Sequence, residues 1–169
     1  SFQLVKPFFG MTALETLMLP SWAPRMRERQ LLAADIESEA RGLLSRIGLG
    51  EKADVLVDQL SQGDLRMLDI GRALATKPKV LFLDEPFSAL SHDETNTLSD
   101  LIRSLKKDGL SVVIIEHRLR ELMALAERIV VINFGTKLAE GLPGDIVRNE
   151  LVIEAYLGKR AQDVATAVN

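Results

Sequence analysis

Two adjacent carboxylates, Asp84 and Glu85, follow the short apolar run VLFL at residues 80–83 and precede Pro86. An unbroken apolar run of this length predicts a strand that is buried on both faces of a parallel sheet. The carboxyl ends of such strands are where open α/β sheets bind their ligands. Carboxylates fixed there can hold a metal ion or orient a water molecule, and an ordinary charged turn after a strand is the alternative.

A helix start lies shortly upstream, in the sequence LSQGD at residues 60–64. Ser61 can cap this helix, and Asp64, three residues later, completes a capping box. The helix should end before Pro78, because proline cannot continue it. A serine hydroxyl and the backbone N–H of Gly63 at a helix amino terminus suit an anion such as phosphate. A simple helix cap would use the same residues.

The rest of the chain predicts alternating helices and strands around these two stretches. Further capping boxes begin helices at Thr12 with Glu15 and at Ser91 with Glu94. The expected helices cover residues 13–19, 26–47 and 119–126, a further helix runs from the Ser91 capping box to a stop at Gly109, and short helices lie around 146 and 153–157. The expected strands cover 111–116, 129–132 and 136–139. The order of strands and helices from 80 to 132 predicts a right-handed parallel α/β unit. No strand pattern occurs in 12–50, which is typical of a helical insert.

A histidine, His117, directly follows the expected strand at 111–116 and the acidic residue Glu116. At a strand end it could donate a hydrogen bond to a phosphate as charge develops during a reaction. The alternative is that this histidine is structural, with its hydrogen bonds made within the protein. The second histidine, His92, lies in a polar loop and is expected to be only solvated.

Length and composition restrict the class of protein. A chain of 169 residues can form one domain that buries roughly 70% of its unfolded surface. The net charge of −3 gives no electrostatic reason to expect nucleic acid as a partner, and the absence of cysteine excludes disulfides and thiolate metal sites. No apolar run approaches the roughly 20 residues that cross a bilayer. The opening SFQLVKPFF lacks an initiator methionine and is typical of a strand end, so we expect an amino-terminal truncation.

Taken in order, these features resemble the ATP-binding subunit of an ABC transporter, from just before its glutamine loop to its carboxyl terminus. Gln3 matches the glutamine loop and His117 the switch histidine; residues 60–64 match the signature, usually LSGGQ, residues 81–86 the Walker B motif, and residues 88–91 the D-loop. The closing segment at 128–158 is similar to that of branched-chain amino-acid transport ATPases. This similarity does not exclude close relatives of that group, such as urea and lipopolysaccharide-export ATPases.

The resemblance implies an α/β fold: a parallel-sheet, P-loop NTPase-like core with an inserted helical subdomain. A carboxyl-terminal β-hairpin with short helices would follow the core. Residues 7–76 would form the helical and signature subdomain, 77–158 the remainder of the RecA-like core, and 159–169 a frayed tail.

The resemblance also implies ATP and Mg²⁺ as cofactors, and it assigns roles to the candidate residues. Glu85 and His117 would be catalytic, while Asp84 and Gln3 would bind Mg²⁺. The other nucleotide-contacting residues would be Ser61, Gly63, Ser88 and Ser91. The first two of these would serve the site of a partner subunit, and the last two would lie along that interface. The signature departs from the usual pattern at Gln62, which replaces a glycine, and at Asp64, which replaces a glutamine.

The implied partners are transmembrane permease subunits, a second ATPase subunit in a homodimer or heterodimer, and indirectly a solute-binding protein. The implied location is the cytoplasmic face of the cell membrane, as a peripheral subunit. No GxxxxGK[ST] occurs in the sequence, so the phosphate-binding loop and its lysine are missing. We therefore expect this chain alone to be inactive as an ATPase.

Three functions agree with these sequence features. The leading one is the carboxyl-terminal portion of an ATPase that powers transport of branched-chain amino acids or similar small solutes. A non-catalytic adaptor of the same ancestry would explain the missing phosphate loop and the altered signature. A DNA-repair ATPase shares the signature and Walker B motifs, but the negative charge and the lack of a heptad arm argue against it.

Overall fold

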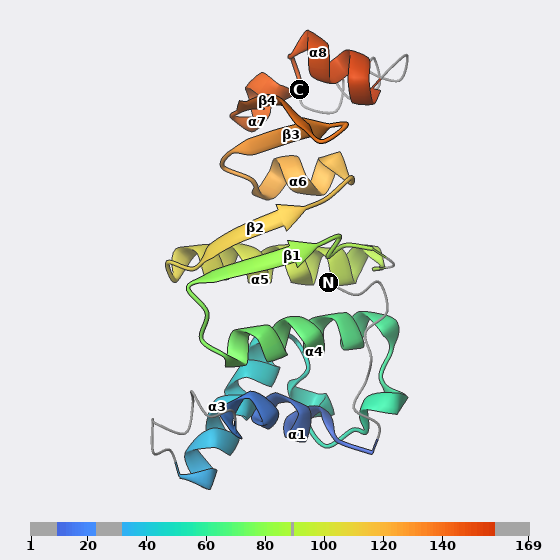
Figure 1. Ribbon diagram of the computed structural model, residues 1–169. Coiled ribbons are helices and arrows are strands. Elements are labelled where there is room, and N and C mark those ends of the chain that lie inside the picture. Colours follow the sequence, from blue (N-terminus) through green and yellow to red (C-terminus); the bar gives the residue numbers. More distant parts are fainter. Residues whose placement is uncertain (1–9, 23–31, 89, 158–169) are drawn as a thin grey trace. The chain divides into compact units, whose positions relative to one another are not determined.

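The computed structural model describes residues 10–22, 32–88 and 90–157 (Figure 1). They belong to two compact units, Ser1–Arg118 and Leu119–Asn169, which are considered separately. Gln3 and the predicted tail at 159–169 lie outside the described residues. No helix among the described residues is long and apolar enough to cross a membrane.

Helices form the amino-terminal part of the first unit (Figure 1). They are α1 (Ala13–Met18), η1 (Leu19–Trp22), α3 (Ala33–Arg46), η2 (Gly50–Lys52), η3 (Val57–Gln59) and α4 (Gln62–Ala75). The predicted capping box of Thr12 and Glu15 begins α1. Leu17, Leu44 and Ile47 are buried where α1, α3 and α4 contact one another. The predicted helical insert is therefore confirmed for the described residues.

Helix α3 begins later than predicted. Leu32 is extended, with φ −70° and ψ 154°, and the helix starts at Ala33. Asp35 accepts a hydrogen bond from the backbone N–H of Leu32 at 3.2 Å, which satisfies one donor at the helix start. A single helix over 26–47 is therefore wrong, because apolar periodicity alone cannot show where the backbone leaves the helix; residues 26–31 lie outside the described part of the chain.

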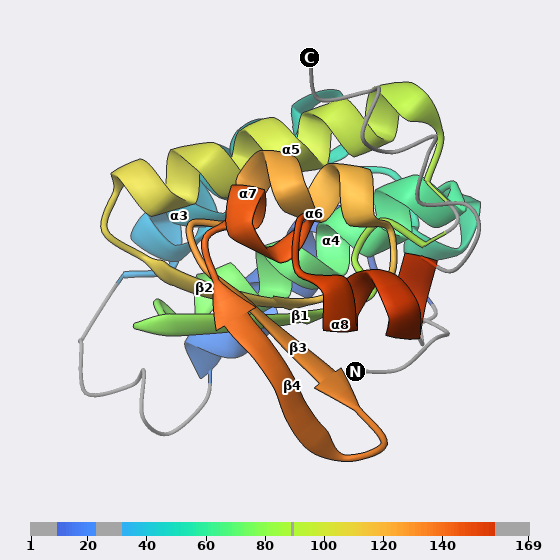
Figure 2. The same cartoon turned by 90° about the horizontal axis from the view of Figure 1, so that it is seen from above.

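A two-stranded parallel sheet completes the first unit. Strand β1 (Val80–Asp84) pairs with β2 (Ser111–Ile115), so that Asp84 lies opposite Ile115. Helix α5 (His92–Lys107) connects the two strands and lies along one face of them (Figures 1 and 2). The predicted α/β fold with a parallel sheet is confirmed.

The apolar runs predicted strands that are buried on both faces. This prediction is wrong, because one face of each strand is exposed. Leu81 and Leu83 are buried, whereas Phe82 is 73% exposed and Ile115 is 63% exposed. Alternate side chains of a strand point to opposite faces, and the described residues of this unit cover only the face on which α5 lies.

The second unit contains an antiparallel hairpin with short helices. Its elements are α6 (Leu119–Leu125), β3 (Ile129–Asn133), β4 (Thr136–Gly141), α7 (Pro143–Ile146), α8 (Glu150–Val152) and η4 (Ile153–Leu157). Strand β3 pairs with β4 in a sheet of its own, with an irregularity after Val131 (Figure 2). Ile129, Ile146 and Val152 form its core. The predicted carboxyl-terminal hairpin with short helices is confirmed.

Burial in the helical part gives a test of the packing. Leu44→Ala should lower the free energy of unfolding by about 2–5 kcal/mol, because Leu44 is fully buried on α3. The matched control is Leu32→Ala, at the exposed start of the same helix, which should change it by less than about 0.5 kcal/mol. Urea unfolding measures both, and equal losses would contradict the described packing of α3.

Candidate functional site

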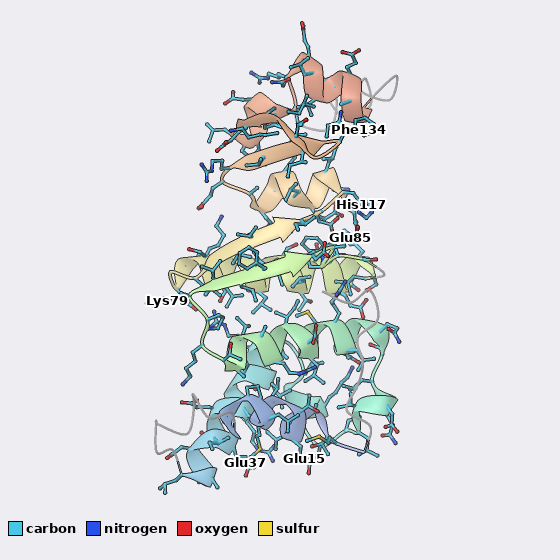
Figure 3. All side chains as sticks on the ribbon, in the orientation of Figure 1. Glu15, Glu37, Lys79, Glu85, His117 and Phe134 are labelled. Atoms are coloured by element: carbon cyan, nitrogen blue, oxygen red, sulfur yellow. The ribbon has the colours of Figure 1, made fainter. Side chains whose placement is uncertain are left out.

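The two predicted catalytic side chains come together at the carboxyl edge of the parallel sheet. Glu85 directly follows β1, and His117 lies two residues after β2. Their side chains lie close together (Figure 3), with 3.6 Å between Glu85 Oε1 and His117 Nδ1. They are 41% and 70% exposed, so both can reach a ligand from solvent. The parallel register explains this proximity, because the two strands end side by side.

The backbone of Glu85 has an unusual conformation. Its φ is +45°, in the left-handed region that residues other than glycine adopt only at a cost of about 1–3 kcal/mol. Three hydrogen bonds fix the backbone there. The Glu85 N–H donates to the Ile115 carbonyl at 2.8 Å, and the Glu85 carbonyl accepts from Arg66 Nη2 at 2.8 Å and from the Ser88 N–H at 3.1 Å.

A buried carboxylate, Glu116, joins the loops that follow the two strands. Its side chain is fully buried. Its oxygens accept hydrogen bonds from the backbone N–H groups of Phe87 at 3.3 Å, His117 at 2.8 Å and Arg118 at 2.9 Å. The Arg118 side chain in turn donates to the Phe87 carbonyl at 2.8 Å. The loop that carries Glu85 is thereby tied to the loop that carries His117.

Sequence reasoning did not identify Arg66, Arg118 or the bonding role of Glu116. Glu116 was singled out only as the neighbour of His117. Arg66 and Arg118 bind backbone carbonyls 19 and 31 residues away in the chain. Such contacts have no local sequence pattern, so nothing in the sequence could have indicated them.

Asp84 is the described residue best suited to bind a metal ion at this edge. It is the last residue of β1 and is exposed. Carboxylate oxygens are ligands that Mg²⁺ accepts, commonly one or two of them together with water and substrate phosphate. The donor type therefore fits Mg²⁺. The described residues contain no cluster of three or more metal-ligating side chains, and Gln3 lies outside them.

The signature segment forms the start of helix α4, as predicted. Ser61 is the N-cap, and its Oγ accepts from the Asp64 N–H at 3.1 Å. The Asp64 carboxylate accepts from the Ser61 N–H at 3.2 Å and from Lys52 Nζ at 2.6 Å. Gln62 is the first residue of the helix and is not among the described residues with positive φ. Its replacement of the usual glycine therefore causes no backbone strain.

The pKa of Asp64 is lowered from its ordinary value. Burial of the carboxyl group acts in the opposite direction and raises the pKa. The hydrogen bond from Lys52 and the hydrogen bonds from Ser61 outweigh burial, because they favour the charged form. Asp64 is thus an ionised helix cap, and its charge is matched by Lys52.

Gly63 marks a close approach between the starts of two helices. It is buried, and a Cβ atom at this position would lie 1.7 Å from Glu94 Oε1 and 2.3 Å from Glu94 Cδ. Glu94 belongs to the capping box of α5: its carboxylate accepts from the Ser91 N–H at 2.8 Å. The absence of a side chain at Gly63 therefore allows the cap of α5 to lie against the start of α4.

The described candidate residues thus form two groups. Asp84, Glu85 and His117 lie at the carboxyl edge of the sheet, whereas Ser61, Gly63 and Ser91 lie at the adjoining starts of α4 and α5. Ser88 is exposed in the connecting turn. Ser61 and Ser91 are helix caps, as expected from the capping boxes, and any contact with a nucleotide remains a prediction.

Comparison with known proteins shows the family. The family model described as ABC transporter matches residues 2–88, and the one described as branched-chain amino acid ATP-binding cassette transporter matches residues 136–162. The high-affinity branched-chain amino acid transport ATP-binding protein LivG of Salmonella typhimurium is 37% identical over 94% of this chain and 67% of its own length. The chain therefore belongs to the family of ABC transporter ATP-binding proteins.

Other relatives extend this similarity. BraF of Pseudomonas aeruginosa, with the same description as LivG, is 35% identical over 94% of this chain and 67% of its own length. The lipopolysaccharide export system ATP-binding protein LptB of Escherichia coli is 34% identical over 76% of this chain and 54% of its own length.

Solved structures show the same fold. An ATP-binding cassette of an ABC transporter in its ADP conformation has a TM-score of 0.75 and 26% identity, over 88% of this chain and 63% of that one. A dimeric cassette in a post-hydrolysis state, bound to ADP and Pi, has a TM-score of 0.71 and 26% identity, over 84% of this chain and 61% of its own. The chain thus spans somewhat less than two thirds of these solved cassettes.

The contact at Gly63 gives a test. Gly63→Ala should lower the free energy of unfolding by about 0.5–2 kcal/mol, because the new methyl group would displace the Glu94 carboxylate from the cap of α5. In a Glu94→Ala background the same substitution should cost less than about 0.5 kcal/mol, since the obstructing carboxylate is gone. Urea unfolding of the four proteins measures the coupling, and equal costs in both backgrounds would contradict the contact.

The lowered pKa of Asp64 predicts a pH dependence. A carboxyl group with a folded-state pKa below its unfolded value of 3.8 stabilises the protein above that value, and this contribution is lost as the pH falls through the folded pKa. The stability of the wild type relative to Asp64→Asn should therefore be greatest near neutral pH and decline below about pH 4. Urea unfolding across this pH range measures the difference. A Lys52→Met background should weaken the pH dependence, and a constant difference would contradict the shift.

Proposed function

We propose that this chain belongs to an ATP-hydrolysing subunit that powers an ABC transporter. The observation that carries the proposal is the pairing of Glu85 with His117, 3.6 Å apart at the carboxyl edge of the parallel sheet. That edge is where α/β sheets bind ligands, and the family to which the chain belongs is defined by ATP binding.

The proposed reaction is attack of water on the γ-phosphate of ATP. Glu85 would orient the water and accept its proton, since its carboxylate is accessible from solvent. His117 would donate a hydrogen bond to a phosphate oxygen as negative charge develops. Asp84 and Gln3 would hold Mg²⁺, which supplies neutralisation of phosphate charge when it is bound. Positioning and charge neutralisation account for most of the catalysis of phosphoryl transfer.

The proposed assembly contains a second ATPase subunit. Ser61 and Gly63 would then contribute a hydroxyl and a backbone N–H to the nucleotide site of the partner, and Ser88 and Ser91 would lie along the interface. The exposure of Ser61 at the start of α4 supports this role, as does the dimeric state of one solved relative. The assembly would bind permease subunits at the cytoplasmic face of the membrane.

The proposed solute is a branched-chain amino acid or a similar small molecule. Two observations support it. LivG and BraF are named branched-chain amino acid transport ATP-binding proteins, and the family model described as branched-chain amino acid ATP-binding cassette transporter matches residues 136–162. A solute-binding protein would act indirectly, by delivering the solute to the permease subunits.

ATP turnover by the complete protein, expressed from the reading frame that contains this chain, tests the catalytic role. Glu85→Gln should lower kcat by about 100-fold or more, because the amide cannot accept the proton from water. The matched control is Glu37→Gln, which replaces an exposed carboxylate of α3 that pairs with Arg41, and it should leave kcat unchanged. Equal rates for wild type and Glu85→Gln would refute catalysis by Glu85 and favour a non-catalytic adaptor.

A further inference from the structure

We propose that Arg66, on the signature helix α4, is a positioning residue that holds Glu85 in its catalytic conformation. The proposal rests on the proposed function, because it assigns to Arg66 an effect on ATP hydrolysis that is exerted through Glu85. Arg66 belongs to the second turn of α4, and it donates from Nη2 to the Glu85 carbonyl at 2.8 Å. A guanidinium donor makes this a charge-assisted hydrogen bond, which is stronger than one between neutral groups.

The backbone of Glu85 needs such support for two reasons. A φ of +45° is unfavourable for a residue that carries a Cβ atom. The next residue is Pro86, and a residue before proline is driven toward extended backbone with negative φ. Left to its local preferences, Glu85 would therefore adopt a different φ, and its carboxylate would move with the backbone. A conformation of this kind persists only where the surrounding structure fixes it.

Several groups together hold the backbone around Glu85 in place. Backbone groups of Ile115 and Ser88 bind its N–H and its carbonyl, and these bonds survive any change of side chain at 66. Glu116 and Arg118 hold the N–H and carbonyl of Phe87, two residues further along. Arg66 supplies the bond from a side chain to Glu85 itself.

Loss of the Arg66 guanidinium should leave the Ser88 N–H as the donor to the Glu85 carbonyl among the described contacts, so that the backbone of Glu85 is held less firmly and can relax. The carboxylate would then lie in its present place, beside His117, for a smaller fraction of the time. Displacement of a reacting group by about 1 Å can slow catalysis by about 100-fold. The effect should fall on kcat, because ATP binding depends on other groups.

Steady-state ATP turnover by the complete protein tests this proposal, with three variants. Arg66→Met keeps an unbranched side chain and removes the donor, and it should lower kcat by about 10- to 100-fold while KM for ATP changes less than about twofold. Arg66→Lys keeps a cationic donor and should recover part of the loss. The matched control, Arg103→Met, removes an arginine of α5 that pairs only with Asp100 among the contacts described, and it should leave both constants unchanged.

Combination with Glu85→Gln separates positioning from a general loss of structure. If Arg66 acts through Glu85, the double variant Arg66→Met/Glu85→Gln should be no slower than Glu85→Gln alone. Losses that multiply, or a wild-type kcat for Arg66→Met beside a slow Glu85→Gln, would overturn the positioning role and leave the proposed function intact. A fast Glu85→Gln would overturn the proposed function itself. Circular dichroism checks folding; if Arg66→Met does not fold, the same cycle with Arg66→Lys decides.

Discussion

The carboxylate of Glu116 is the constraint on which the geometry of the sheet edge depends. It is fully buried, and a buried carboxylate is tolerated only when hydrogen bonds replace its lost hydration. Backbone N–H groups of Phe87, His117 and Arg118 provide these bonds. Because the three donors come from the loops after β1 and β2, satisfying one side chain fixes both loops. The parallel register brings Glu85 and His117 to the same edge, and the hydrogen bonds of Glu116 then tie the two loops together there.

The starts of helices α4 and α5 follow the same physical rule with different residues. The first amide groups of a helix have no partner within it, and a carboxylate three residues after the cap satisfies one of them. Asp64 does this for α4 and Glu94 for α5. Glu94 can lie against the other helix only because Gly63 has no side chain. The cap of α5 therefore depends on the lack of a side chain at Gly63, in the first turn of α4.

The difference between local and distant contacts explains which features were predictable from the sequence. The capping boxes of Ser61 and Ser91 were predicted correctly, because a cap depends on residues three apart. The proximity of Glu85 and His117 was not predicted, although it agrees with parallel strands that end at one edge. The bond from Arg66 to the Glu85 carbonyl and the left-handed φ of Glu85 could not be predicted, since both depend on tertiary contacts. Burial of Phe82 was predicted wrongly because apolar runs do not show which face is covered.

Helix α4 carries residues of one group of candidate residues and contacts the other group through Arg66. Ser61 caps it, its first turn carries Gly63, and its second turn carries Arg66, which donates to the Glu85 carbonyl in the loop after β1. Gly63 and Arg66 are three residues apart and therefore neighbours on one helix. If a ligand shifted the first turn of α4, the backbone of Arg66, whose side chain donates to Glu85, would shift with it. In the proposed dimer, nucleotide bound in the partner's site would in this way influence the position of Glu85 in the subunit that supplies the signature.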